Sequence, residues 1–545
     1  MRIANGILEY LKEIGVDYVF GIPAGTISPL FDALNDVEIK PIVAKNEAGA
    51  AFMAARYASV TSKMSVCIGA GGVGVNNMMN GIADAYRAKA PVLILTGYIH
   101  RWQIGKGAIQ ELNTEDILKP ITKYSKTILR EEDVMKELEH AIKVANTVPM
   151  GPVHLSIPID IQLNKMVEEI KVVDLEKSTK KDVNTKDEEE LLQKACDIID
   201  DTKKGVILVG KGARGKSDLV KQLSNHLKWP IITTPEGKGV VSSEFSLNLG
   251  NYGFASTDAA SDYVNDPEVN CLLVVGSSLG ENATNNFNSA LTEGKKVIHI
   301  DWDARELGKV YDTDIKLCMD MSVAIPYIVS HTDRSEESFI KPTINVPVQK
   351  TNTGVSLKEF MEQLPDFMPK DTYYMADMGE FMNFAFKYLS IPEGGDFETN
   401  LNYAAMGAAI GGAVGVQVAY PERCVAVFAG DGDFFMNGME VLTAKEYNYP
   451  IVYFIINNAM LGFVEHGHSY LFERVVEGFK QERISISKML GACGVKAMEL
   501  SENSQISQIP DFLKDLKGPA VIEIITDGSE IAPNGDRLKA LQKKS

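Results

Sequence analysis

The chain has 545 residues and a formal net charge of −18 at pH 7. Its length allows about three domains, and its 45% hydrophobic and 23% charged residues are ordinary for a globular protein with a large core. The acidic balance disfavours nucleic acid or an anionic membrane as a partner. The first residues lack the apolar run of a signal peptide, no run suffices for a membrane span, and six scattered cysteines lack metal spacing. We therefore expect a cytoplasmic protein with reduced thiols.

Two charged or polar tracts, 165–190 and 331–354, divide the chain into three blocks. The predicted domains are 1–165, 190–330 and 355–545, each of an ordinary domain size. Every block alternates short apolar runs with amphipathic stretches, the pattern of buried parallel strands alternating with helices. The sequence thus predicts an α/β protein with three doubly wound parallel-sheet domains, of which the first and third could be copies of one fold.

The N-terminal block has apolar runs that begin at Tyr18, Met64 and Pro91 and read as buried strands. Glu47 opens a helix rich in small residues, where an acid is favoured by the helix dipole alone. The stretch 69–77 is a glycine-rich turn between a strand and a helix, which serves either tight packing or a ligand contact. In isolation, neither feature defines a function.

The central block contains Gly210-Lys-Gly-Ala-Arg-Gly215 between an apolar run at 205–209 and an expected helix. This matches the G-x-G-x-x-G pattern in the strand-to-helix context that a dinucleotide-binding turn requires. A nucleotide site is therefore one prediction for this block, and a tight packing turn is the other.

The C-terminal block contains the most informative pattern of the chain. Gly430-Asp431-Gly432 ends one apolar run, and Asn458, 27 positions after Asp431, ends the next. That spacing fits one strand-helix-strand crossover, which places both polar residues at the carboxyl edge of a parallel sheet. Carboxylate and amide oxygens suit Mg²⁺, and the glycines let backbone N–H groups approach a phosphate. The pattern predicts a Mg²⁺-bridged diphosphate site.

This pattern resembles the GDG and NN signature of thiamine diphosphate (ThDP) enzymes. Similar segments cover most of the chain and point to the acetolactate synthase and pyruvate oxidase branch of that family. They are Phe20–Gly25, Asn46–Tyr57, Gly69–Ala85, Ile104–Glu111, Ala404–Gly407, Gly430–Asn437 and Asn458–Val464.

The resemblance implies a role for each matching residue. Glu47 would hydrogen-bond the pyrimidine ring of ThDP, and Gln110 would face the substrate. Asp431, Asn458 and the carbonyl of Met460 would bind Mg²⁺. Met406 would wedge the cofactor into its bent shape. The implied cofactor contacts are Gly25, Gly72, Asn77, Gly379, Glu380, Phe381, Met406, Gly430, Gly432, Asp433, Asn458 and Leu461.

The implied reaction is ThDP- and Mg²⁺-dependent decarboxylation of a 2-oxo acid, with pyruvate as the expected donor, followed by carboligation to an acetolactate-type product. The family builds its site from two subunits, which implies a homodimer or homotetramer. Its central domain binds FAD, ADP or no nucleotide. Asp433 stands where the family often has Ser or Ala, and an acid beside a diphosphate must point away or be paired.

Two departures bear on specificity. The His pair of pyruvate decarboxylases is missing near Ile109 and Gln110, which argues against simple release of an aldehyde. Gly467 stands where biosynthetic acetolactate synthases have Trp, between His466 and His468. These histidines are candidate acid/base groups or ligands for a substrate carboxylate or phosphate, or else exposed loop residues.

Four alternatives remain at this stage. Two are enzymes of the same fold: a ThDP-dependent decarboxylase or 2-hydroxyacyl/acyloin lyase that releases an aldehyde, and an FAD-dependent pyruvate oxidase. The others are a non-catalytic paralogue and a simple nucleotide-binding module. Intact Glu47, Asp431 and Asn458 argue against the paralogue, and a nucleotide module leaves the metal pattern unexplained.

Overall fold

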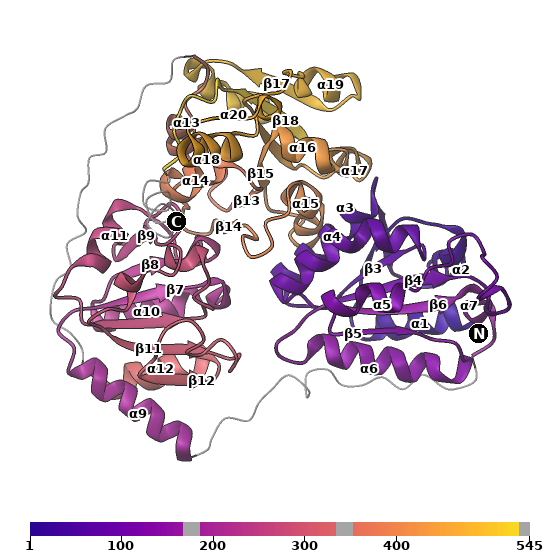
Figure 1. Cartoon of the computed structure of the whole chain (residues 1–545), viewed down its shortest axis with the longest axis horizontal. Coiled ribbons are helices and arrows are strands. Elements are labelled where there is room, and N and C mark those ends of the chain that lie inside the picture. Colours follow the sequence, from indigo (N-terminus) through magenta and orange to yellow (C-terminus); the bar gives the residue numbers. More distant parts are fainter. Residues whose placement is uncertain (167–185, 334–352, 534–545) are drawn as a thin grey trace.

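The computed structural model describes residues 1–166, 186–333 and 353–533. These ranges form three α/β domains, each built on a six-stranded parallel sheet (Figure 1). The predicted fold class is therefore confirmed. Most of both tracts predicted as linkers lies outside the described residues. Among the helices that the structure describes, none is long and apolar enough to cross a membrane.

The N-terminal domain has the strand order β2-β1-β3-β4-β6-β5. Its central strands are buried along their whole length, which explains their unbroken apolar sequences. The strands are β1 Tyr18–Gly21, β2 Lys40–Val43, β3 Ser65–Gly69, β4 Val92–Tyr98, β5 Tyr124–Thr127 and β6 Val153–Pro158. The helices are α1 Ile3–Glu13, α2 Ser28–Ala33, α3 Glu47–Thr61, α4 Val73–Ala88, α5 Thr114–Leu118, α6 Val134–Asn146 and α7 Ile159–Leu163.

The central domain has the strand order β12-β11-β10-β7-β8-β9, the doubly wound order of dinucleotide-binding folds. Its strands are β7 Gly205–Val209, β8 Ile231–Thr233, β9 Asn248–Asn251, β10 Cys271–Val275, β11 Lys296–Asp301 and β12 Ile315–Cys318. Its helices are α9 Lys186–Asp200, α10 Ser217–Leu227, α11 Asp258–Asn265 and α12 Met321–His331.

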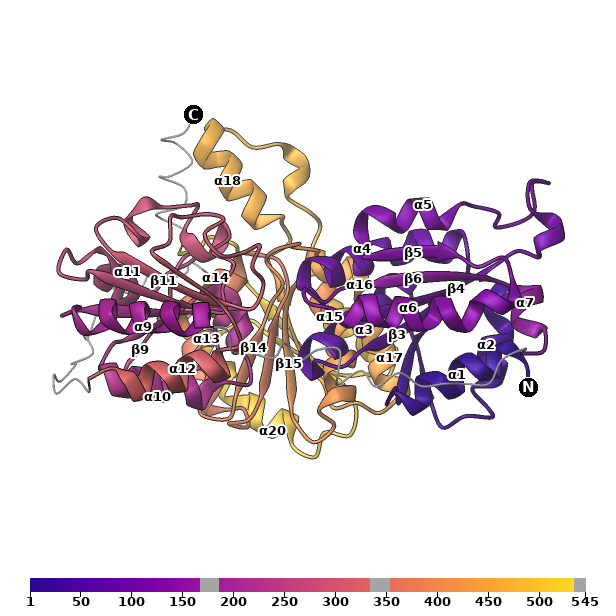
Figure 2. The ribbon, with the colours of Figure 1, turned by 90° about the horizontal axis from the view of Figure 1, so that it is seen from below.

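The C-terminal domain repeats the topology of the N-terminal domain, with the order β14-β13-β15-β16-β18-β17. The strands are β13 Tyr373–Ala376, β14 Asp396–Glu398, β15 Val425–Gly430, β16 Val452–Asn457, β17 Lys496–Leu500 and β18 Ala520–Ile525. The helices are α13 Leu357–Gln363, α14 Glu380–Tyr388, α15 Ala408–Ala419, α16 Asp431–Asn437, α17 Glu440–Glu446, α18 Gly462–Phe472, α19 Ile486–Ala492 and α20 Ile509–Leu513. Of these, α18 projects from the body of the domain (Figure 2).

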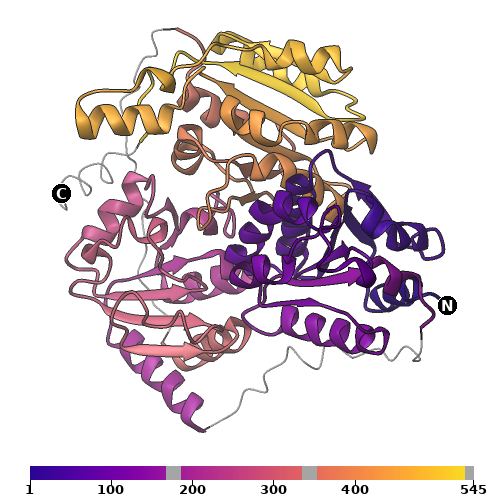
Figure 3. The same cartoon turned by 45° about the vertical axis from the view of Figure 1, so that its right-hand side comes forward.

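The N-terminal and C-terminal domains lie against each other (Figure 3), and helices α3 and α15 pack together there through small residues. A Cβ on Gly415 would lie 2.1 Å from the Met53 carbonyl oxygen, and one on Gly412 would lie 2.4 Å from Arg56 Cγ. Both glycines are therefore required for the close approach of the two helices. The contact is buried on both sides and fixes where each domain presents its loops.

Candidate cofactor site

A pocket opens at the carboxyl ends of β15 and β16, with an empty volume of about 770 Å³ including its mouth. This is the edge at which open α/β sheets bind ligands, and the size suits a small-molecule site. Every candidate cofactor or metal residue of the C-terminal domain lines this pocket. They are Gly379, Glu380, Phe381, Met406, Gly430, Asp431, Gly432, Asp433, Asn458, Met460 and Leu461.

Asp431 ties together the two loops that follow β15 and β16. Its Oδ1 accepts the Gly432 N–H and its Oδ2 accepts the Ala459 N–H, both at 2.9 Å. The Asn458 side-chain oxygen accepts the N–H of Met460 at 3.1 Å. Burial raises the pKa of Asp431 above its ordinary value. A carboxylate, an amide oxygen and a carbonyl thus lie on adjoining turns, the hard oxygen set that Mg²⁺ prefers.

The pocket wall is acidic, and none of the described residues that line it is Lys or Arg. Besides the residues predicted from the sequence, Asp527 and Glu530 line it from the loop after β18. Asp527 accepts the Thr353 N–H at 2.9 Å, and Glu530 accepts the Leu357 N–H at 2.6 Å. A diphosphate could enter such a pocket only with a divalent cation to offset the carboxylates. Asp431 with its neighbouring oxygens fits that cation.

In the described residues, no cluster of three or more His, Cys, Asp or Glu side chains could hold a metal ion. A cation in this pocket would therefore depend on amide and carbonyl oxygens beside Asp431. Sequence reasoning missed two carboxylates of this pocket, Asp527 and Glu530. Both follow the buried strand β18, and polar residues soon after a buried strand are the pattern that could have predicted them.

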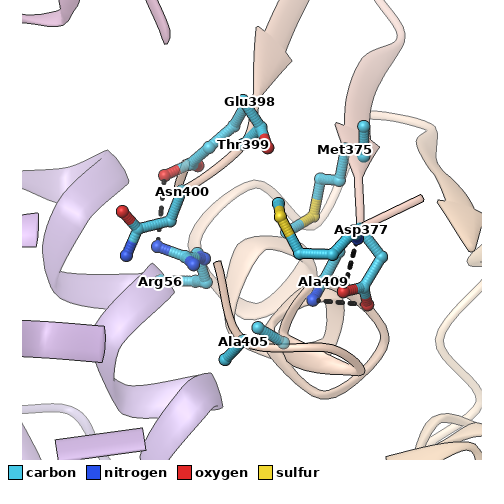
Figure 4. Close-up of a pocket in the computed structure, with 11 residues that line it drawn as sticks. Arg56, Met375, Asp377, Glu398, Thr399, Asn400, Ala405 and Ala409 are labelled. Carbon is cyan, nitrogen blue, oxygen red and sulfur yellow. Dashed lines mark hydrogen bonds and ion pairs between the residues drawn. The ribbon is translucent and has the colours of Figure 1, made fainter. Parts of the chain in front are cut away.

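Asp433 lines the pocket, and its carboxyl group hydrogen-bonds back to the backbone at the start of α16. Its Oδ2 accepts the Gly430 N–H at 2.7 Å, and the residue is 1% exposed. Burial, together with the nearby Asp377 carboxylate, raises the pKa of Asp433 well above its ordinary value. Asp377 itself accepts the N–H of Ala409 near the start of α15 (Figure 4) and the N–H of Gly407, and burial raises its pKa to about 7. The expected conflict with a diphosphate is reduced because the raised pKa of Asp433 favours its neutral form.

The two candidate histidines of α18 lie in different surroundings. The Nδ1 of His466 lies 2.7 Å from Oε1 of Glu380, which lines the pocket, and this hydrogen bond raises the pKa of His466. The ring of His468 instead packs against Phe472 and Phe479, with ring centroids 4.5 and 5.2 Å away. His466 therefore reaches the pocket wall through Glu380, whereas His468 does not line the pocket.

The candidate residues of the N-terminal domain form a second group at the carboxyl ends of β1, β3 and β4. Asn77 donates its side-chain N–H to Glu47 Oε2 at 2.9 Å. A Cβ on Gly72, whose φ is +61°, would lie 2.7 Å from the backbone oxygen of Gln110. Gly25 opens the turn Gly25–Ile27, which contacts β4. Sequence reasoning thus selected residues that do gather in space.

In the part of the chain that the structure describes, none of the N-terminal candidates lines the C-terminal pocket. The described residues that line it lie between Leu357 and Glu530, and Glu47 is not among them. Glu47 is partly exposed at the start of α3, with Asn46 capping that helix by accepting the Ala48 N–H at 2.8 Å. Each chain therefore presents two separate halves of the predicted site.

A buried charged cluster joins all three domains. Arg56 of α3 lies 2.9 Å from Asp84. It also lies 3.8 Å from Glu398 of β14, and Figure 4 draws this second pair. Lys211 of the central domain lies 3.5 Å from the same Glu398, and Arg214 donates to the Phe397 carbonyl at 2.7 Å. Burial alone would raise the pKa of Glu398, but the three surrounding cations lower it to about 2.

The loop that matches the dinucleotide pattern supplies two of those cations. Its glycines pack on the loop after β10, where the strand order reverses: the Gly210 N–H donates to Val275 and the Gly212 N–H to Gly276, both at 2.9 Å. A Cβ on Gly210 would lie 2.3 Å from the Gly276 oxygen. The glycines are therefore required by contact between two backbones.

Sequence comparisons agree with this geometry. Three models describe the thiamine pyrophosphate enzyme: its N-terminal TPP binding domain matches residues 1–117, its central domain 192–328, and its C-terminal TPP binding domain 377–524. The chain is 28% identical to a probable acetolactate synthase large subunit of Methanocaldococcus jannaschii, over 99% of this chain and 94% of that protein. It is 29% identical to the acetolactate synthase large subunit of Lactococcus lactis, over 96% and 92% of the two chains. It is 28% identical to the acetolactate synthase isozyme 2 large subunit of Escherichia coli, over all of both chains.

The chain therefore belongs to the thiamine pyrophosphate enzymes, which use ThDP as their cofactor. Within that family it lies in the acetolactate synthase branch, and it is a ThDP-dependent enzyme that forms carbon–carbon bonds.

Proposed function

We propose that this enzyme decarboxylates a 2-oxo acid, with pyruvate as the favoured donor, and joins the remaining two-carbon unit to a second carbonyl compound to give an acetolactate-type product. The observation that carries this proposal is the acidic pocket around Asp431 and Asn458, which suits a Mg²⁺-bound diphosphate. Bound ThDP supplies the electron sink that lets CO₂ leave. We propose the domain bounds 1–165, 190–330 and 355–545, because each range encloses one sheet.

In this proposal, Asp431, Asn458 and the Met460 carbonyl hold Mg²⁺. The backbone of Gly430, Gly432 and Asp433 and the turn 379–381 then surround the diphosphate. A Cβ on Gly432 would lie 3.0 Å from Met406 Cε and 3.6 Å from Leu461 Cδ2, so both side chains close directly over the loop. These contacts are the expected place for the bent cofactor to rest.

Removal of Mg²⁺ with a chelator is expected to weaken ThDP binding on the order of 100-fold, because the pocket carboxylates would then face the diphosphate without a cation. Asp431→Asn should produce a similar loss, measured by isothermal titration calorimetry. Asp527→Asn is the matched control, since it removes one carboxylate from the same pocket wall but leaves the loops after β15 and β16 unchanged. Equal losses in the two variants would contradict the role of Asp431.

We further propose a homodimer or homotetramer in which Glu47 of one chain faces the pocket of its partner. The separation of the two half-sites supports this arrangement, as do exposed apolar side chains beside each half. Val73 follows Gly72 and is 53% exposed, and Phe435 and Met436 of α16 are 50% and 60% exposed. Such side chains next to a site are typical of a surface that a second chain covers.

The remaining candidates take their roles from position. Gln110 would face the substrate, whereas Glu47, Gly25, Gly72 and Asn77 would contact the cofactor. His466 is the better acid/base candidate of the two histidines, because it contacts Glu380 in the pocket wall. For the central domain, we infer that the 210–215 loop joins domains rather than cradling a nucleotide, since Lys211 and Arg214 already contact β14. This favours the synthase over an FAD-dependent oxidase.

The decisive assay supplies pyruvate, ThDP and Mg²⁺ to the purified protein and follows CO₂, acetolactate and acetaldehyde together. We expect CO₂ and acetolactate to appear in equal amounts, because one donor loses CO₂ for each carbon–carbon bond formed. Acetaldehyde as the main product would favour the decarboxylase alternative. No pyruvate consumption, with ThDP binding confirmed, would redirect the search to bulkier 2-oxo acids or 2-hydroxyacyl thioesters.

A further inference from the structure

Glu440 is a buried acid of the C-terminal domain whose carboxylate binds the backbone of the N-terminal domain. It opens α17 and is 1% exposed. The N–H of Lys45 donates to both its oxygens, at 3.1 and 3.2 Å, and the N–H of Asn46 donates to Oε1 at 2.9 Å. Lys45 and Asn46 are the two residues that directly precede Glu47. The carboxylate therefore fixes the backbone from which the Glu47 side chain starts.

Two neighbours hold this carboxylate in place. The Thr443 hydroxyl donates to Glu440 Oε2 at 2.7 Å. On the opposite side, a Cβ on Gly49 would lie only 2.2 Å from Glu440 Oε1, so a glycine is needed at that position for the acid to fit. Burying a carboxylate costs free energy unless it is hydrogen-bonded. An interface that served apolar packing alone would therefore contain neither a buried acid nor the glycine that makes room for it.

The residue that directly follows α17 also orders the residues before this turn. The Tyr447 hydroxyl accepts the Val43 N–H at 2.8 Å, at the end of β2. Thus α17 and Tyr447 hold the connection from β2 to α3 from outside the N-terminal domain. The connection carries its own cap for α3 at Asn46, so helix formation alone does not require Glu440.

A simple interdomain contact is already present nearby and does not need a buried acid. Lys45 Nζ lies 2.5 Å from Glu446 Oε1, and the Glu446 side chain is 57% exposed. Such exposed pairs contribute little to stability. The buried carboxylate differs because it accepts backbone N–H groups, and those groups set the direction of the chain at Glu47.

We propose that Glu440 is a positioning residue for Glu47, which holds the residues before it so that its carboxyl group projects toward the cofactor. This inference rests on the proposed function, in which Glu47 reaches ThDP bound by the partner chain. Glu440 itself touches neither substrate nor cofactor in this proposal. Its effect is confined to the orientation of Glu47.

The test compares Glu440→Gln with Glu446→Gln, which removes the same charge from the same helix and the same interdomain contact. Amide hydrogen exchange of the apoprotein reports whether Lys45 and Asn46 lose protection. Exchange of the C2 proton of bound ThDP with solvent reports whether Glu47 is oriented. We expect Glu440→Gln to deprotect both amides and to slow C2 proton exchange by roughly 10- to 100-fold at nearly unchanged ThDP affinity. Glu446→Gln should change neither.

Equal effects of the two variants would overturn the proposal, as would deprotected amides with an unchanged C2 exchange rate. A wild-type protein that binds ThDP without C2 proton exchange would contradict the proposed function itself. If Glu440→Gln does not fold, Thr443→Val takes its place, because it loosens the carboxylate while leaving it present. It should cause a smaller loss in the same two measurements.

Discussion

Glu47→Gln is expected to lower the rate of carboligation by roughly 10²- to 10⁴-fold, the usual contribution of a positioned acid or base. The substitution keeps the shape of the side chain and its hydrogen bond from Asn77 can reverse direction, so the fold should persist. ThDP affinity should change little, because the pocket that would hold the diphosphate lies in the C-terminal domain. Steady-state kinetics and calorimetric ThDP titration on the same preparation separate the two effects. Strongly weakened ThDP binding would instead make Glu47 a binding residue.

A hybrid dimer turns this prediction into a test of where the site is built. One chain carries Glu47→Gln, the other Asp431→Asn, and each is inactive alone. Dimers that contain one copy of each, purified through two different tags, should recover about half the wild-type activity if the site lies between chains. In that case one site of the hybrid combines an intact Glu47 with an intact Asp431. If both residues act within one chain, the hybrid stays inactive.

The C-terminal cofactor and metal candidates lie at one pocket, as sequence reasoning predicts, because their signal is local. Asp431 and Asn458 each follow a buried strand, so their meeting at one sheet edge follows from the parallel topology. The same reasoning could have included Asp527, which follows β18 next to β16. The hydrogen-bond partner of Asp433 could not be predicted from the sequence. In the structure its carboxylate accepts the Gly430 N–H.

Contacts between domains were out of reach of that reasoning. Glu440 lies 394 positions from Asn46, and nothing in the residues around either one predicts their hydrogen bond. The 210–215 loop has a clear local pattern, but its contacts could not be predicted either. Its sequence matches a dinucleotide-binding turn in every position, yet Lys211 and Arg214 contact Glu398 and Phe397 of another domain. A local sequence pattern can predict the conformation of a turn. The function of that turn depends on which residues pack against it.

Glu398→Gln is expected to destabilise the protein by about 3–5 kcal/mol, the usual cost of breaking a buried ion pair from one side. Glu398 is 1% exposed, and its loss leaves Arg56 and Lys211 with fewer anionic partners in a buried setting. The matched control is Glu393→Gln, which removes another ion pair between the central and C-terminal domains. That pair joins Lys221 to a Glu393 side chain that is 64% exposed, so its loss should cost under about 1 kcal/mol. Urea unfolding followed by fluorescence measures both variants, and equal shifts would contradict the special role of the buried cluster.

The pH dependence of the same comparison identifies the cause. The folded protein lowers the pKa of Glu398 from 4.5 to about 2, so its ionised form is favoured by folding. This contribution is fully present above the unfolded pKa and is lost as pH falls through the folded one. The stability difference between wild type and Glu398→Gln should therefore be constant near neutral pH and shrink below 4.5. A difference that does not depend on pH would assign the effect to packing instead of charge. Because Arg56 lies on the helix that begins with Glu47, a charge effect would also mean that the cluster helps to hold α3 against the C-terminal domain.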